Sequence, residues 1–245
     1  MINELSHIIC GDDYTTSNGI TLHNPTLREI KEFGEFNYLK LIEYITMRPY
    51  DIAVELWDKG VNYQDVSDFT IFISNVKGLP NDFTELIFGD LDFQKFEAQV
   101  NPQNMLPVLT NGKYIIDEMI YREIVEYVRR INYIEEKVEY DMANKAGIKF
   151  LIQRMRRKRE KAAKKTAEPY LSNLISTMVN TADFPYNYST IFDVKISQLY
   201  NGFYRKDKID TAHQITQAIY AGTINKKDVS NSLLNYYGEL KKNKS

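Results

Sequence analysis

Apolar residues recur at helical spacing through most of this 245-residue chain, and proline or glycine separates one run from the next. The first run is the clearest, because Asn24-Pro25-Thr26 supplies a helix start and Thr26 has capping-box spacing to Glu29. We expect Gly34, within this run, to mark a close helix contact or a break. Apolar residues make up 43% of the chain and charged residues 26%, which is ordinary for a globular protein. The pattern predicts helices close to residues 26–46, 49–60, 63–76, 117–142, 169–179, 189–203 and 209–222.

One region departs from helical spacing. The segment FEAQV alternates between apolar and polar residues, as half-buried strands do. The following segment PVLTNGKYII places Asn111-Gly112 between two apolar runs, which is the strongest short hairpin signal. We therefore predict a mainly α, multi-helix protein with a small β-hairpin or three-stranded sheet near residues 94–116.

Two segments carry weaker structural signals. Residues 1–24 are expected to form an irregular or partly extended lead-in, in which Ile20 and Leu22 fit a short strand. The segment FTELIFGD is apolar but too short to assign by periodicity. No internal repeat of fixed period is present in the sequence.

Basic residues are concentrated between Lys145 and Lys165, where ten Lys or Arg residues accompany one acidic residue, Glu160. The local charge is +9 in a chain of net charge −2, so the remaining residues carry −11. Apolar residues keep helical spacing only as far as Met155, and beyond it the stretch is charged on nearly all sides. We expect residues up to Met155 to pack as a continuation of the preceding helix, and Arg156 to Lys165 to form an exposed joint.

This basic stretch divides the chain into three predicted parts. They are an N-terminal helical region with the small β insertion at residues 1–142, a basic helical arm at 143–167 and a C-terminal helical region at 168–240. The arm has three interpretations: a solvated helix face, a surface that binds nucleic acid through phosphates, or a surface that docks on an acidic protein, including another copy of this chain. Only the arm is basic, and no aromatic residue is interleaved within residues 151–165, so docking or solvation is favoured over nucleic acid. The candidate partner-binding residues are Lys149, Arg154, Arg156, Arg157, Lys158, Arg159, Lys161, Lys164 and Lys165.

The sequence gives little sign of catalytic chemistry. The three histidines are far apart, and the single cysteine, Cys10, excludes an intramolecular disulfide or a cysteine cluster for zinc. P-loop, GxGxxG, HExxH and G-x-S-x-G motifs are absent. Asp90 and Asp92 beside Gly89 have the chemistry to ligate Mg²⁺, but acids next to glycine are common in turns. We therefore predict no enzyme activity, no catalytic residue, no cofactor and no metal, and keep a Mg²⁺-dependent enzyme as the weakest alternative.

The sequence carries no targeting signal that we recognise. The N-terminal residues lack the basic region and the long apolar core of a signal peptide. No window approaches the roughly 18 apolar residues that a membrane span needs. We expect a soluble protein that stays in the compartment where it is made and has no membrane partner.

The words NPTLREI, DFPYNY and YAGTI stand out in this helical pattern. Together with the helix patterning, they make about residues 20–238 resemble a family of uncharacterised proteins from phages and prophages of low-GC Gram-positive bacteria. The resemblance implies a virion-morphogenesis protein, with a tail-assembly, chaperone-like factor as the nearest label, in the host cytoplasm or the virion. It implies other phage structural or assembly proteins as partners, is compatible with a homo-oligomer, and supplies no catalytic residues.

Overall fold

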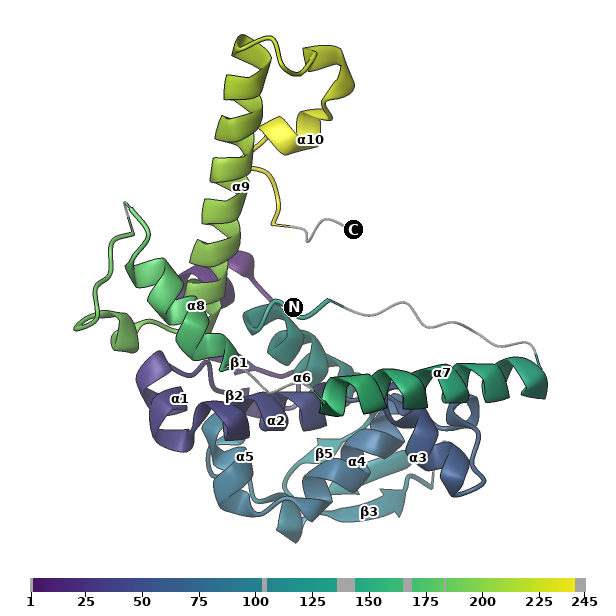
Figure 1. Cartoon of the computed structure of the whole chain (residues 1–245). Helices are drawn as coiled ribbons and strands as arrows, with labels where there is room; N and C mark the ends of the chain where they lie inside the picture. The colour runs from purple at the N-terminus through teal and green to yellow at the C-terminus, as the bar shows by residue number, and fades with distance from the viewer. Residues whose placement is uncertain (1, 103–104, 136–143, 165–168, 183, 241–245) are drawn as a thin grey trace.

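The computed structural model describes residues 2–102, 105–135, 144–164, 169–182 and 184–240. These residues are mainly helical, as predicted, and two small antiparallel sheets accompany the helices (Figure 1). The α-helices are α1 (Leu27–Phe33), α2 (Glu35–Thr46), α3 (Ala53–Asp58), α4 (Asp68–Gly78), α5 (Asn81–Phe88), α6 (Glu118–Ile131), α7 (Lys145–Ala163), α8 (Tyr170–Val179), α9 (Ile196–Tyr220) and α10 (Asn231–Leu234). The shorter helical turns are η1 (Glu4–Cys10), η2 (Pro49–Ile52), η3 (Tyr63–Asp65), η4 (Phe93–Lys95), η5 (Ile191–Asp193) and η6 (Lys226–Asp228). The strands are β1 (Tyr14–Thr15), β2 (Thr21–Leu22), β3 (Glu97–Val100), β4 (Pro107–Thr110) and β5 (Ile115–Ile116).

The predicted three-stranded sheet is confirmed, with strand order β3-β4-β5 and antiparallel pairing throughout. Gly112 has a φ of +83°, which glycine adopts readily, and this lets the chain turn between β4 and β5. The Asn111 side chain accepts hydrogen bonds from the backbone of Lys113, at 3.1 Å, and Tyr114, at 2.9 Å. The hairpin signal in the sequence therefore acts through the turn residues themselves.

The N-terminal lead-in is more regular than predicted. Asn3 caps a single π-helical segment, η1, by accepting a hydrogen bond from the Ser6 backbone at 3.1 Å. After η1, strands β1 and β2 pair with each other, so the short strand expected at Ile20 and Leu22 is part of a second sheet. The segment that periodicity left unassigned is the helix α5.

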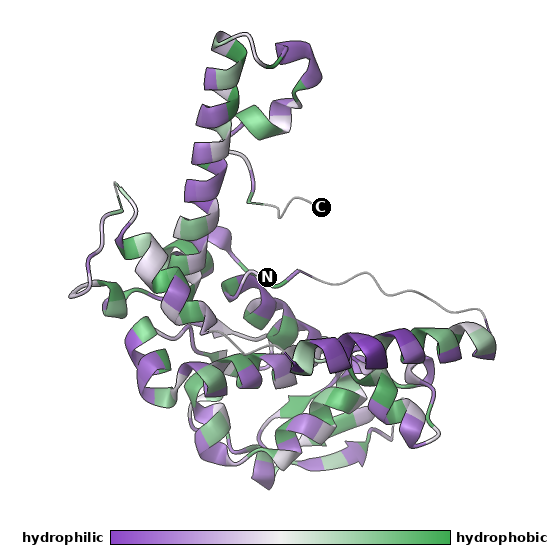
Figure 2. Ribbon diagram, viewed as in Figure 1, coloured by the Kyte–Doolittle hydropathy of each residue, from purple (hydrophilic) through white to green (hydrophobic). Residues whose placement is uncertain are grey.

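The main hydrophobic core joins segments from both halves of the sequence. Tyr38 of α2, Phe72 of α4 and Tyr127 of α6 are fully buried in it. Leu199, near the start of α9, is equally buried in the same cluster. Figure 2 shows hydrophobic and hydrophilic residues alternating along these helices. This core fixes the frame on which α1, α5 and α7 are mounted.

The run of residues 26–46 is divided at Gly34, whose φ of +94° separates α1 from α2, and this confirms the break that was one of the two expectations for this residue. One predicted helix boundary is wrong for an identifiable reason. The helix predicted to reach Met142 ends at Ile131, because Asn132 caps the Val128 carbonyl with its side chain at 2.9 Å. The backbone then turns at Tyr133, which has a φ of +53°. Residues 136–142 of that prediction lie outside the described part of the chain.

The C-terminal half contains one long helix where the sequence predicted two. The segment at 204–208 has a weak apolar stripe, but Lys206 and Asp210 form an ion pair one turn apart at 2.5 Å, and α9 continues through it. Figure 1 shows the outer half of α9 standing away from the rest of the molecule, with α10 folded back beside it. Arg205 holds the end of the described chain by donating to the carbonyls of Tyr236, at 2.7 Å, and Gly238, at 2.9 Å.

Helix length and hydropathy agree with the expectation about membrane spans. Within the described residues, every helix is either too short or too polar to cross a bilayer.

Candidate binding surfaces

The basic helix α7 is mounted on α3 by an apolar face. Ile148, Leu151 and Ile152 are buried against Ala53 and Val54 in a hydrophobic cluster separate from the main core. The three α7 residues follow the i, i+3, i+4 spacing of one helix face. The apolar face predicted from the sequence is therefore present. It packs α7 on α3, however, and α7 does not continue α6, which ends at Ile131.

Two of the predicted partner-binding residues help to hold α7 in place. Arg156 forms an ion pair with Asp58, and Arg159 forms one with Glu55. Arg159 also donates to the Asp51 carbonyl at 2.8 Å. Burial raises the pKa of Glu55, but the hydrogen bond and the charge of Arg159, together with a backbone hydrogen bond, outweigh it, and the net pKa is lowered.

Residues from Arg156 to Lys164 are exposed as predicted, apart from the partly buried Arg159, but they do not form a separate joint. The helix α7 continues to Ala163 without a break, and two of its arginines face α3. Asp58 and Glu55 of α3 lie opposite the later turns of α7. Ion pairs with these two side chains hold this part of α7 on α3, where the helix has no apolar face. Lys165, the last predicted residue, lies outside the described part of the chain.

The other cations of α7 point toward solvent. Arg154, Arg157, Lys161 and Lys164 are exposed and recur at intervals of three and four, so they share the face opposite the buried residues. Phe150 lies on the same face, with 68% of its surface exposed. We call Phe150, Arg154, Arg157, Lys161 and Lys164 the outer face of α7. None of its cations is ion-paired with another described residue, and Figure 2 shows this helix as strongly hydrophilic along the same stretch.

Lys149 and Lys158 complete the predicted set. Both are exposed and lie at the edges of the outer face, on either side of it. The structure thus brings six of the nine predicted residues to one exposed surface or its margins, and two more form ion pairs with α3 while staying partly exposed. Lys165 lies outside the described residues.

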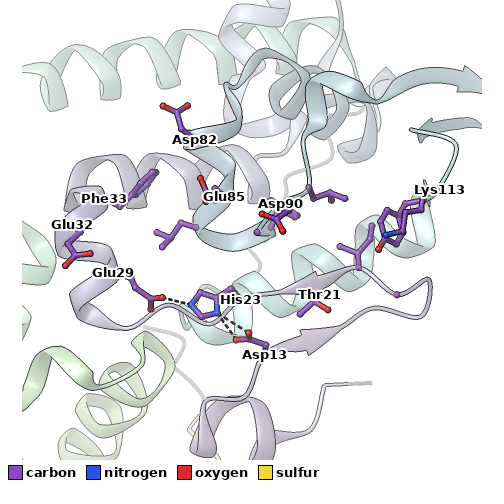
Figure 3. A pocket seen from close by; sticks show the side chains of 17 residues that line it. Asp13, Thr21, His23, Glu29, Glu32, Phe33, Asp82, Glu85, Asp90 and Lys113 are labelled. Atoms are coloured by element: carbon purple, nitrogen blue, oxygen red, sulfur yellow. Dashed lines mark hydrogen bonds and ion pairs between the residues drawn. The ribbon is translucent and has the colours of Figure 1, made fainter.

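A second surface was not predicted: an acidic cleft between α1, α5, the β1–β2 hairpin and the β4–β5 turn (Figure 3). Its volume is about 790 Å³. Its floor includes the partly buried apolar side chains of Phe33, Leu86 and Leu91. The lining acids are Asp13, Glu29, Glu32, Asp82, Glu85 and Asp90, whereas Lys113 is the lining residue with a permanent positive charge.

His23 organises one side of this acidic cleft. Its Nδ1 lies 3.0 Å from Asp13 Oδ1, and its Nε2 lies 3.0 Å from Glu29 Oε1 (Figure 3). An imidazolium can donate from both nitrogens, which this arrangement accommodates. Burial raises the pKa of Glu29, but hydrogen bonds from Thr26 and the charge of His23 outweigh it, and the net pKa is lowered.

The aspartates considered for Mg²⁺ have separate local roles. Asp92 accepts a hydrogen bond from the Gln94 backbone at 3.0 Å and lies 3.3 Å from Lys95 Nζ, so it caps the turn η4. Asp90 is exposed at the rim of the acidic cleft. Among the residues that the structure describes, no group of three or more His, Cys, Asp or Glu side chains is arranged to hold a metal ion.

Sequence reasoning missed the acidic cleft because its acids come from three separate segments, around residues 13, 29–32 and 82–90. Each segment has an ordinary acidic content on its own. The only sequence signal was the excess of negative charge outside the basic stretch, which gives no position.

Comparisons with known proteins place a family resemblance in the C-terminal part. Residues 161–241 match a family model described as the YomV second domain. This segment takes in the end of α7, all of α8, α9 and α10, and none of the acidic cleft. Neither the curated proteins nor the solved structures contain a match to the chain.

Proposed function

We propose that this chain is a non-enzymatic phage morphogenesis protein, a tail-assembly or chaperone-like factor or a minor virion component, that binds other phage proteins through the outer face of α7. YomV is a protein of a Bacillus prophage, so the matching segment supports a phage origin. The observation that carries the binding role is an exposed Phe150 among four outward cations on a helix fixed to the body.

The packing of α7 on α3 favours binding of a partner to the outer face. A helix that is already ordered loses little further conformational entropy when a partner arrives. Arg156 and Arg159 contribute to this order by pairing with α3, and the outer face keeps its cations for a partner. An exposed aromatic ring with an arginine one turn away on the same helix face is the kind of group that dominates protein interfaces.

The charge distribution favours a protein partner over nucleic acid. The chain outside residues 145–165 carries −11, and this negative charge opposes close approach of a phosphate backbone. The preferred partner is therefore a protein with an acidic, partly apolar surface.

Affinity capture from cells that are producing the phage tests this role. The tagged chain is expected to retain one or more virion or assembly proteins. The double variant R154E/R157E should lose them, because it reverses the centre of the outer face. The matched control K226E/K227E makes the same change in charge on η6, where both lysines are exposed, and should retain them. Equal capture by R154E/R157E and the unaltered chain would refute the assignment of this surface.

Nucleic-acid binding by the same face is the second candidate, since Phe150 lies among the cations and could stack on a base. Duplex and single-stranded DNA binding at about 50 mM and about 200 mM salt distinguishes it, because phosphate-driven binding falls steeply over that range. We expect no binding at the lower salt concentration. Salt-sensitive binding that R154E/R157E abolishes, together with no captured protein, would reverse the assignment.

A further inference from the structure

We infer that one partner of the outer face of α7 is a second copy of this chain, which receives that face in its acidic cleft. The inference rests on the proposed function in using the same face, and it adds the identity and the location of a partner. Both surfaces are present on every copy, so the contact joins two different patches of identical chains.

The charges of the two surfaces match. The outer face presents four cations without an ion-pair partner among the described residues. In the acidic cleft, His23 already engages Asp13 and Glu29. The carboxylates of Glu32, Asp82, Glu85 and Asp90 remain on the rim, and no described residue forms an ion pair with any of them.

The apolar groups of the two surfaces match as well. Phe150 is 68% exposed on the outer face, which is costly for a large aromatic side chain that has no partner. The acidic cleft has an apolar floor of Phe33, Leu86 and Leu91, and the Phe33 ring already lies 5.5 Å from the Phe83 ring. A further ring on this floor would be buried next to aromatic and aliphatic groups, with carboxylates around it to meet the cations.

The contact has to form between chains. Within one chain, α7 is held on α3 by its buried face and two ion pairs, and its outer face is directed away from the protein. When each copy uses its two patches on two different neighbours, the pairing produces rings or open chains. The net charge of −2 means that copies repel each other only weakly at long range.

Sedimentation velocity of the purified full chain tests the inference. We expect species larger than a dimer as the protein concentration rises at about 0.1 M salt, and monomer at about 1 M salt, where the Debye length shrinks from about 10 Å to about 3 Å. A chain that remains monomeric at the lower salt concentration and high protein concentration would overturn the inference.

Charge reversal on each surface then identifies the contact. R154E/R157E reduces the net charge of the outer face from +4 to zero, whereas E32K/E85K replaces two acids of the cleft with lysines while the outer face stays basic. Each variant alone should be monomeric at about 0.1 M salt, because the charge attraction between the two surfaces is then largely removed. An equimolar mixture of the two should associate again, since one retains the original cleft and the other the original outer face. Association of either variant alone, or failure of the mixture to associate, would contradict the contact.

The apolar part is tested by F150A, which leaves every charge in place. It should weaken association at about 0.1 M salt, and circular dichroism should be unchanged because Phe150 is exposed. If the unaltered chain is monomeric but R154E/R157E still loses captured phage proteins, self-association fails and the proposed function stands. If self-association holds but no phage protein is captured, the reverse conclusion follows.

Discussion

At the scale of single residues, one buried polar pair joins two helices of the main core. The Tyr38 hydroxyl donates to Asn132 Oδ1 at 2.6 Å, and both side chains are almost fully buried. Asn132 also closes the end of α6 through the Val128 carbonyl. This pair links the position of α2 to the point where α6 ends.

Removing the Tyr38 hydroxyl should lower the free energy of unfolding. Tyr38→Phe leaves the Asn132 oxygen buried without its partner, and such a loss typically costs about 1–3 kcal/mol of stability. Urea unfolding should show this decrease in the free energy of unfolding. Tyr237→Phe, which changes a 77% exposed residue in the same way, should leave the free energy of unfolding close to that of the unaltered chain. Equal stability of the Tyr38 and Tyr237 variants would contradict the role of the pair.

The lowered pKa of Glu29 predicts that the stability of the fold depends on pH. Its folded pKa is lowered, although burial acts in the opposite direction, because Thr26 donates hydrogen bonds to it and His23 lies beside it. A carboxylate with a lowered folded pKa stabilises the fold above its unfolded value of about 4.3, and that contribution is lost as the pH falls through the folded pKa.

The corresponding measurement compares the unaltered chain with Glu29→Gln between about pH 6 and pH 3, a range that spans the unfolded pKa. The unaltered chain should be more stable at the upper end, and its advantage should shrink as the pH falls. Glu32→Gln removes an exposed charge from the same helix and controls for the change in net charge. If the stability advantage of the unaltered chain over Glu29→Gln grows toward low pH, the prediction is contradicted.

At the scale of elements, α7 illustrates what sequence reasoning can and cannot reach. The periodicity of Ile148, Leu151 and Ile152 correctly predicted a buried face. The element it packs on was not predictable, because periodicity describes one helix and gives no information about its neighbour. The ion pairs of Arg156 and Arg159 depend on acids about 100 residues earlier, and for that reason the sequence alone grouped these arginines with the exposed ones.

Docking of α7 on α3 can be tested by hydrogen exchange. Ile152→Ala removes a buried side chain from the small cluster, and a change of this kind costs about 2–5 kcal/mol in a packed core. Because this cluster is separate from the main core, amides of α7 should exchange faster while those of α4 and α6 keep their protection. Gln153→Ala, on the exposed side of the same helix, should change neither. Faster exchange throughout the molecule would contradict local docking.

At the scale of the whole molecule, the sequence predicted individual elements well, but it did not predict how these elements pack together. The hairpin, the helical class and most apolar faces followed from turn residues and spacing that lie within a few positions of each other. The acidic cleft required α1, α5 and the β1–β2 hairpin to meet, which no local pattern specifies. The continuity of α9 was missed because one ion pair compensates for a weak apolar stripe.

The molecule is asymmetric, with a cationic helix at one surface, an acidic cleft at another and a projecting α9. We propose that the outer face of α7 is covered by protein during phage production. A photo-crosslinking amino acid in place of Gln153 reports directly on this, because Gln153 is exposed between Phe150 and Arg157. A probe in place of Gln217, exposed on α9, controls for random collisions.

Illumination of cells that are producing the phage gives the decisive comparison. We expect the probe at position 153 to form adducts with a virion or assembly protein or with a second copy of this chain. R154E/R157E should remove these adducts, whereas any adducts of the probe at position 217 should persist. Adducts to nucleic acid alone at position 153, or protein adducts that R154E/R157E leaves unchanged, would contradict this proposal.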